Sequence, residues 1–303
     1  MRSTALIAAL GLGAVATLPR ISVAVSTATP LPSIVDVVVG SEDFETLETA
    51  LITADLVDAL DGPGPFTVFA PTDEAFDSLP AGLLDSLLLA ENRDQLTNVL
   101  TYHVLSRAVQ AETAVTLPYA QALNGQRIPF FYDEKMGFFV DGALVSTTDV
   151  QCSNGVIHII EAVMVPALTD LVTTADDAGT FSTLDTALRA TRLRQPLETT
   201  GPYTVFAPLD SAFAALPDGA IQALLDEPGR TTLSNVLTFH VVPGRVYSDQ
   251  LEGANLTTLQ GQQLRFRDNG TDIGVGGAKI MARDIETTNG VIHVIDKVLM
   301  PMP

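Results

Sequence analysis

The chain contains four histidines, and they form two matched pairs. His103 lies in Thr-Tyr-His-Val and His240 in Thr-Phe-His-Val. His158 and His293 each follow the segment Asn-Gly-Val-Ile. Corresponding histidines are 137 residues apart in the first case and 135 in the second. This period is far longer than that of a solenoid repeat and matches the size of a self-sufficient domain. The sequence therefore predicts two tandem globular domains of related structure.

Longer segments recur at a similar offset and define the extent of each copy. They are FTVFAPTDEAFDSLP from Phe66 with YTVFAPLDSAFAALP from Tyr203, and LTNVLTYHV from Leu96 with LSNVLTFHV from Leu233. We predict domain 1 at residues 33–166 and domain 2 at residues 167–302, with no Gly/Ser-rich linker between them.

The first 28 residues are predicted to be a secretory signal peptide, with cleavage after Ala16, Ala24 or Ala28. Arg2 supplies the positive start, and residues 5–18 form a largely apolar run. This run is too short to cross a bilayer, which needs about 20 apolar residues. We expect a secreted or extracellular protein, located in the periplasm or at the cell surface if the source is a bacterium. The mature chain is expected to have no transmembrane segment.

Charge and cysteine content exclude several classes of partner and of stabilising bond. The net charge is −20, and residues 29–166 hold 4 basic and 20 acidic side chains against 10 and 16 in residues 167–303. The electrostatic field of this negative charge opposes binding to nucleic acid or to anionic lipid.

Cys152 is the only cysteine, so no internal disulfide is available and each domain depends on its hydrophobic core. Because Cys152 aligns with Thr287, we favour a passive small side chain over a reactive or intermolecular thiol.

In each copy, helical patterns precede strand patterns. In domain 1, helices are expected within residues 33–60 and at residues 83–89 and 95–101, with Thr72 or Asp73 capping a further helix. Strands are expected at residues 66–70, 128–132 and 137–140, and the almost wholly apolar run 156–165 predicts a central strand. This order predicts an α+β fold with helices on one side of mainly antiparallel strands.

Sequence motifs of catalysis, metal binding and nucleotide binding are absent. There is no G-x-S-x-G, no H-E-x-x-H and no P-loop. Gly274, Gly276 and Gly277 lie among strand signals and are interpreted as a turn or bulge. No histidine has another histidine or a cysteine three to five residues away. We therefore predict no catalytic residue, no cofactor and no metal site, and hence a protein that is not an enzyme.

Two groups of residues leave alternatives open. Each histidine lies in an apolar run, where imidazole usually bonds to the backbone within a core, although recognition near His103 and His240, a pH switch or metal binding remain alternatives. Arg189, Arg192 and Arg194 form either a solvated helix face or a dock for a small anion or glycan.

The repeated segments resemble fasciclin-type (FAS1) domains of the beta-Ig-H3/fasciclin family. The segments that carry this resemblance are TVFAPTDEAF, NVLTYHVL and NGVIHIIEAVMVP in domain 1, and TVFAPLDSAF, NVLTFHVV and NGVIHVIDKVLMP in domain 2. The resemblance covers residues 33–302. It implies that each domain is a wedge-shaped, mainly antiparallel β-sandwich flanked by helices. It also implies extracellular adhesion or matrix binding without catalysis.

The same resemblance implies a set of partner-binding positions. In animal members, a Tyr-His motif and an Asp-Ile motif have been linked to integrin binding. The positions that match these motifs in the two domains are Tyr102, His103, Asp149, Phe239, His240, Asp284 and Ile285. Domain 2 has phenylalanine in place of tyrosine, domain 1 has Val150 in place of isoleucine, and the chain has no RGD tripeptide. An integrin partner is therefore not implied.

Our main hypothesis is a secreted, non-enzymatic cell-adhesion or extracellular-matrix-binding protein whose two domains offer a bivalent surface. Its partner would be a protein or glycan of the cell surface or matrix, and homophilic contact is also open. The alternative is an exported protein that binds a small ligand, a glycan or a cation, through the acidic face of domain 1 or the arginines near Arg192. Asn255 and Asn269 are glycosylation acceptors only in a host that modifies such sites.

Overall fold

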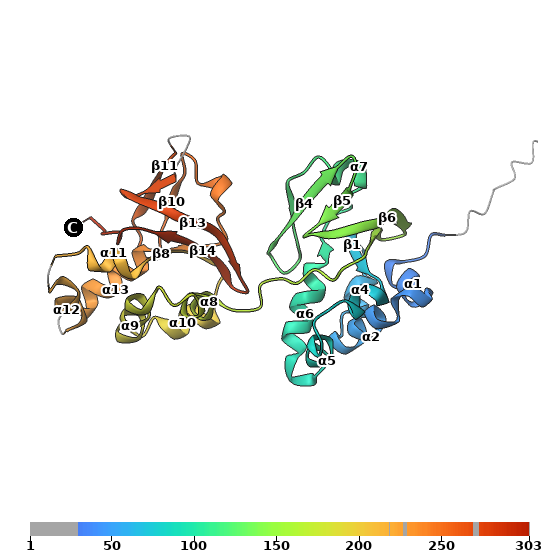
Figure 1. The fold of residues 1–303 in the computed structure, drawn as a ribbon, viewed down its shortest axis with the longest axis horizontal. Coiled ribbons are helices and arrows are strands. Elements are labelled where there is room, and N and C mark those ends of the chain that lie inside the picture. The colour runs from blue at the N-terminus through green and yellow to red at the C-terminus, as the bar shows by residue number, and fades with distance from the viewer. Residues whose placement is uncertain (1–29, 218, 227–228, 269–272, 303) are drawn as a thin grey trace, which may run out of the picture. The chain divides into compact units, whose positions relative to one another are not determined.

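The computed structural model describes residues 30–217, 219–226, 229–268 and 273–302. The predicted signal peptide, residues 1–28, and the glycosylation acceptor Asn269 lie outside these ranges. From Pro32 onward a similar series of helices and strands occurs twice (Figure 1).

The helices of domain 1 begin at side chains that satisfy their free N–H groups. At the first helix, the hydroxyl of Ser33 accepts a hydrogen bond from the backbone N–H of Asp36, whose carboxylate accepts one from the N–H of Ser33. The expected helical stretch of residues 33–60 divides into α1 (Ile34–Val39), η1 (Glu42–Phe44), α2 (Glu45–Ala54) and α3 (Val57–Leu60). The remaining helices are α4 (Asp73–Asp77), α5 (Leu83–Leu87), η2 (Ala90–Asn92), α6 (Arg93–Tyr102) and α7 (Ala111–Ala114).

The strands of domain 1 form one mixed sheet in the order β2-β1-β7-β6-β5-β4-β3. Their bounds are β1 (Phe66–Pro71), β2 (Val104–Leu105), β3 (Tyr119–Gln121), β4 (Arg127–Asp133), β5 (Gly137–Val140), β6 (Ala143–Cys152) and β7 (Gly155–Ile160). Strands β1 and β7 run parallel, and the other neighbours run antiparallel. β7 is central, as predicted, but it ends at Ile160. Beyond it the chain leaves the sheet, and Met164 is buried without belonging to a strand.

Each side of the central strands faces a different core. Successive side chains of a strand point to opposite faces, so Val68 and Ala70 pack against the helices whereas Phe69 packs inside the curled sheet. The curl is located at β6, whose pairing with β7 shifts register twice between Val145 and Val150. Bulges of this kind bend a strand and increase its twist. β6 therefore joins the two halves of a sheet that closes around its own core.

Domain 2 repeats this arrangement, with strand order β9-β8-β14-β13-β12-β11-β10 and a parallel pair formed by β8 and β14. Its strands are β8 (Tyr203–Pro208), β9 (Val241–Pro243), β10 (Asn255–Thr257), β11 (Gln263–Asp268), β12 (Ile273–Val275), β13 (Ala278–Thr287) and β14 (Gly290–Ile295). Its helices are α8 (Leu171–Ala178), α9 (Ser182–Thr191), α10 (Arg194–Thr199), α11 (Asp210–Ala214), α12 (Ala220–Leu225), α13 (Arg230–Phe239) and η3 (Ser248–Gln250).

In both copies most helices gather on one side of the sheet (Figure 1). The predicted fold class is confirmed: two tandem α+β domains, each with a curled and mainly antiparallel sheet flanked by helices. Within the part of the chain that the structure describes, no helix is both long and apolar enough to span a bilayer.

Asn154, in the turn before β7, joins three separate segments of domain 1. Its side-chain oxygen accepts a hydrogen bond from the backbone N–H of Ile34 at 3.0 Å. Its side-chain nitrogen donates to the carbonyl oxygens of Leu60 and Gly62 at 2.7 and 3.1 Å. Its own carbonyl accepts from the N–H of Phe66 at 3.0 Å. One residue therefore ties the start of α1, the end of α3 and the start of β1 to the closing strand.

Asn289 has the same role in domain 2. Its side-chain oxygen accepts from the N–H of Leu171 at 2.9 Å, and its side-chain nitrogen donates to the carbonyl oxygens of Leu197 and Thr200 at 2.8 and 2.9 Å. Its carbonyl accepts from Tyr203 at 3.0 Å. The Asn-Gly pair that the sequence shows twice is therefore a structural joint in both domains.

The glycine of each pair permits the close approach of the parallel strands. A methyl group on Gly155 would overlap the carbonyl oxygen of Phe66, and one on Gly290 would overlap that of Tyr203. A side chain at either position would therefore separate β1 from β7 or β8 from β14.

We predict that Gly155→Ala lowers the free energy of unfolding of domain 1 by about 3 kcal/mol, because a backbone strand must shift to admit the methyl group. Urea denaturation of the full chain, followed by circular dichroism, measures this loss. Gly142→Ala is the control. Gly142 has φ +80° with open space around it, so the substitution carries only the conformational cost of about 1 kcal/mol. Equal losses in the two variants would contradict the steric explanation.

Candidate functional site

The histidines of domain 1 use both ring nitrogens to bind the backbone. His103, at the end of α6, is 3% exposed. Its Nδ1 lies 2.8 Å from the carbonyl oxygen of Val99, and its Nε2 accepts a hydrogen bond from the N–H of Met164 at 3.0 Å. Because a carbonyl only accepts, Nδ1 carries the proton and the ring is neutral. This contact holds the chain after β7 against the end of the helix.

His158, on β7, is fully buried and has the opposite tautomer. Its Nε2 donates to the carbonyl oxygen of Val109 at 2.9 Å, and its Nδ1 accepts from the backbone N–H of Asp149 at 3.2 Å. Its ring also stacks on Phe69, with centroids 5.5 Å apart. The ring therefore fixes the loop before α7 and the bulged part of β6.

Domain 2 repeats these bonds. His240 contacts the carbonyl oxygen of Val236 at 2.7 Å and accepts from the N–H of Leu299 at 2.9 Å. His293 contacts the carbonyl of Val246 at 2.9 Å and accepts from the N–H of Asp284 at 3.3 Å. The structural interpretation of the histidines is thus borne out in both copies.

Burial favours the neutral form of all these rings. It lowers the pKa of His103 and His240 to about 4, and it also lowers the pKa of His158 and His293. A second proton would place an N–H group against a backbone N–H that already donates to the ring. Among the described residues, no group of three or more His, Cys, Asp or Glu side chains is placed to hold a metal ion.

The structure buries the aromatic residues of the predicted partner-binding set. Tyr102 is 4% exposed, and its hydroxyl donates to the carbonyl oxygen of Arg127 at 3.0 Å. It therefore anchors the first residue of β4. Phe239 is 7% exposed and packs in the core inside the domain 2 sheet, together with Phe206. His103 and His240 are buried beside them.

The predicted aspartates lie in a different part of each domain, next to the second histidine. Asp149 and Asp284 both adopt φ 60°. The carboxylate of Asp149 accepts from the N–H of Ala111 at 2.9 Å, and that of Asp284 accepts from the N–H of Ser248 at 2.7 Å and from its hydroxyl. Ile285 is half-buried against the helix-side core of domain 2. These residues therefore fix the bulged strands β6 and β13.

Sequence reasoning missed the role of Asp73. Thr72 caps α4 as expected, but Asp73 reaches back to α2 and accepts from the backbone N–H of Thr46 at 2.8 Å. Asp210 repeats this contact with Thr183 at 2.7 Å. Burial raises the pKa of both aspartates, but the hydrogen bonds that their carboxylates accept together outweigh it, so that the pKa of each is lowered. The signal in the sequence was the acid that follows the repeated VFAP segment at the same place in both copies.

Two of the three arginines of the alternative hypothesis, Arg189 and Arg194, form ion pairs within domain 2. Arg194 pairs with Asp176, Asp185 and Glu198, and Arg189 also pairs with Asp185 at 2.7 Å. An anion at this helix face would have to compete with those carboxylates. This arrangement does not favour the glycan or anion dock near Arg192.

Exposed aromatic side chains gather on one hairpin of domain 1, formed by β4 and β5. Phe131, Tyr132 and Met136 are 52%, 52% and 57% exposed. Phe139 is half-buried, and its ring centroid lies 6.2 Å from that of Phe131. We call these four residues the aromatic hairpin. Exposed aromatic and methionine side chains are enriched at protein interfaces, so the aromatic hairpin is the candidate partner-binding surface of domain 1.

Comparisons with known proteins agree with the duplicated architecture. The fasciclin domain model matches residues 42–166 and again residues 179–301. Transforming growth factor-beta-induced protein ig-h3 of Sus scrofa is 33% identical over 248 residues, which are 80% of this chain and 35% of that protein. The chain thus spans about a third of the length of this relative. Protein sll1483 of Synechocystis is 47% identical over 137 residues, 45% of this chain and 74% of that protein.

This chain is also similar in fold to a solved FAS1 domain pair from the insect cell adhesion molecule fasciclin I. The match covers 85% of this chain and 96% of the chain in that structure. Its TM-score is 0.42 at 20% sequence identity.

The buried histidines predict a stability that falls with acidification. Their pKa is lower in the folded state than the ordinary value of about 6.5, so between about pH 6.5 and 4 the unfolded chain binds more protons and stability decreases as pH falls. His103 and His240 should each remove about 2 kcal/mol between about pH 7 and pH 5. The carboxylates with lowered pKa lose their contribution only below about pH 4.

Urea denaturation at several pH values measures this slope, and His103→Gln provides the comparison. Glutamine keeps a donor and an acceptor but does not titrate. The variant should be less stable at neutral pH and should show a slope smaller by about one proton. A free energy of unfolding that is constant between pH 7 and 5 in the wild-type chain would refute the prediction.

Proposed function

Because the chain belongs to the fasciclin domain family, we propose that it is an exported, non-enzymatic adhesion protein that binds a cell-surface or matrix component. Its location would be extracellular, or the periplasm or cell surface if the source is a bacterium. The partner would be a protein or glycan, with homophilic contact as one form of the same function. The family resemblance implies this class of function, and the surface chemistry of domain 1 supports it.

The aromatic hairpin is the observation that carries the proposal. Exposed Phe131 and Tyr132 each leave apolar surface in contact with water, which binding to a partner would remove. Their exposure contrasts with the buried state of the adjacent Phe130 and Phe138, which belong to the core inside the sheet. Such a surface suits recognition of a partner and requires no chemical step.

The residues most suited to acid–base chemistry are used to hold the fold. Each histidine has one ring nitrogen against a backbone carbonyl and the other against a backbone N–H. Neither nitrogen faces a substrate, and protonation is disfavoured. This arrangement supports a binding function over catalysis.

In this proposal, the partner-binding residues suggested by the sequence act indirectly, by fixing the strands of the sheet that carries the binding surface. Tyr102 fixes the start of β4, the strand that presents Phe131. Asp149, through its contacts with Ala111 and His158, fixes β6, which continues the same sheet. We propose that Phe239, His240, Asp284 and Ile285 act in the same indirect way in domain 2.

We predict that Phe131→Ser combined with Tyr132→Ser lowers the attachment of cells from the source organism to a surface coated with the chain by at least about tenfold. Two exposed aromatic side chains contribute on this scale when they are buried at an interface. Ile52→Ser is the matched control, since Ile52 is an apolar side chain exposed by 60% on helix α2. Attachment that is insensitive to the hairpin variant would remove this surface from the proposal.

We propose that domain 2 makes a second contact with the partner, distinct from the aromatic hairpin of domain 1, and the duplication then predicts an avidity effect. Two linked weak sites can strengthen attachment by a factor on the order of 10² to 10⁴ when both are engaged. The tandem chain should therefore compete for the partner at much lower concentration than either domain alone, once each domain has been shown to unfold cooperatively. Equal competition by a single domain and by the tandem would argue against bivalent binding.

A further inference from the structure

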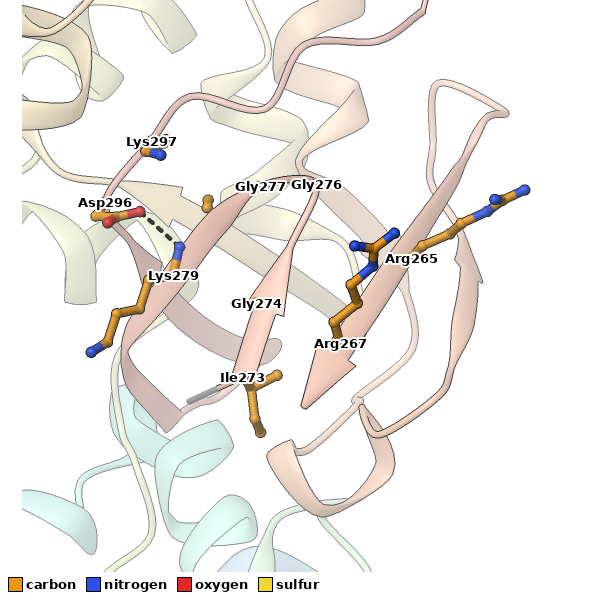
Figure 2. Close-up of a pocket in the computed structure, with 10 residues that line it drawn as sticks. Arg265, Arg267, Ile273, Gly274, Gly276, Gly277, Lys279, Asp296 and Lys297 are labelled. Carbon is orange, nitrogen blue, oxygen red and sulfur yellow. Dashed lines mark hydrogen bonds between the residues drawn. The ribbon is translucent and has the colours of Figure 1, made fainter. Parts of the chain in front are cut away.

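Domain 2 carries a surface pocket of about 660 Å³ that the adhesion proposal does not use. It lies over β11, β12 and β13 and the segment that follows β14. Its charged lining residues are Arg265, Arg267, Lys279, Asp296 and Lys297. Figure 2 shows Gly274 between two groups of cations, with the arginines of β11 on one side and the lysines on the other. Volumes of about 300–1,000 Å³ are usual for small-ligand sites.

Strand register explains why this pocket is open. Across the sheet, Arg267 pairs with Gly274, and Gly274 pairs with Lys279. Neighbouring strands are about 4.8 Å apart, so the backbones that carry Arg267 and Lys279 are separated by roughly 10 Å. The residue between them has no side chain. The cross-strand row of Arg267, Gly274 and Lys279 therefore forms a trough with a cationic residue on each side.

Domain 1 provides an internal comparison at the same place in the fold. There the corresponding row is Phe131, Phe139 and Leu144, in the same register on β4, β5 and β6. Phe139 fills the position of Gly274, and Phe131 stands where domain 2 has Arg267. The same scaffold therefore presents an apolar ridge in one copy and a cationic trough in the other.

The cations are concentrated here against the charge of the whole chain. The net charge is −20 with only 16 basic residues, and four of these line this one pocket. Asp296, which also lines it, accepts a hydrogen bond from the backbone N–H of Lys279 at 2.7 Å. That carboxylate is thus engaged in joining β13 to the end of β14. The exposed arginines provide forked donors suited to a carboxylate or sulfate group.

We infer that this pocket binds an acidic sugar, with a carboxylate or sulfate group over Gly274 and the sugar ring extending along the trough. The negative field of the chain opposes the approach of a densely charged polymer such as nucleic acid or of an anionic bilayer. A saccharide with isolated charges reaches the local cations with less repulsion. The inference does not rest on adhesion, because a free oligosaccharide can bind whether or not the chain attaches to cells.

Calorimetric titration of the full chain at low salt tests the inference. The probes are a galacturonate tetrasaccharide, a sulfated chondroitin tetrasaccharide and a neutral galactose tetrasaccharide. We expect saturable binding of at least one acidic probe, weakened by added salt, and no binding of the neutral probe. Absence of saturable binding by both acidic probes, or equal binding of the neutral one, overturns the inference. Stronger binding to phosphatidylglycerol vesicles than to either acidic probe overturns it as well.

Two variants locate the site. Arg267→Gln should weaken binding at least about tenfold, the usual scale for loss of a charge-assisted hydrogen bond. Gly274→Phe should do the same without changing the charge, because it places in the trough the side chain that domain 1 carries at the corresponding position. Arg107→Gln, an equal loss of charge at an exposed position of domain 1, should leave affinity within about twofold.

Circular dichroism and thermal melting establish that each variant remains folded. Unchanged affinity in folded Arg267→Gln and Gly274→Phe would overturn the assignment of the site. A loss in Arg107→Gln equal to that in Arg267→Gln would also overturn it, by showing that net charge and not the trough determines binding. Cell attachment by the aromatic hairpin is measured separately, so either proposal can fail while the other stands.

Discussion

The side chain of one asparagine in each domain holds together segments that are distant in the chain. Asn154 and Asn289 satisfy backbone groups from the first helix and from the turn before the first strand, and each stands directly before the closing strand. The glycine that follows lets the parallel strands approach closely. Buried backbone groups are costly when unpaired. In each domain this joint therefore links the first helix and the end of the helix before the first strand to the parallel pair of strands.

The histidines and aspartates extend the same principle to the rest of the domain. His158 and Asp149 hold the bulged strand β6, and His103 holds the chain that leaves β7. Their polar groups are directed at the backbone, so they maintain the curl of the sheet. The exposed rows of the sheet take no part in these hydrogen bonds, so substitution there leaves the joint undisturbed. The contrast between Phe139 and Gly274 shows how far two copies can diverge at such a row.

Much of the fold could be predicted because its signals are local. Alternating or helical patterns, turn residues and the capping Thr72 are read within a few positions, and β5 was predicted with its observed limits. The role of Asp73 was not predictable in this way, because its partner Thr46 lies in another helix. The prediction that the strand continues beyond Ile160 is wrong for a related reason. Burial of Met164 outside a sheet produces the same composition as a buried strand.

The sequence alone determined that the domain is duplicated, that it belongs with fasciclin-type modules and that it folds without disulfides, because repeats, motifs and cysteine count need no knowledge of contacts. Only the tertiary structure decided which side chains face water. Tyr102 and Phe131 are both aromatic and both lie near turns, yet one is in the core and the other is exposed. Exposure depends on strand register and on the elements packed over each face, and these are set by contacts between residues far apart in the chain.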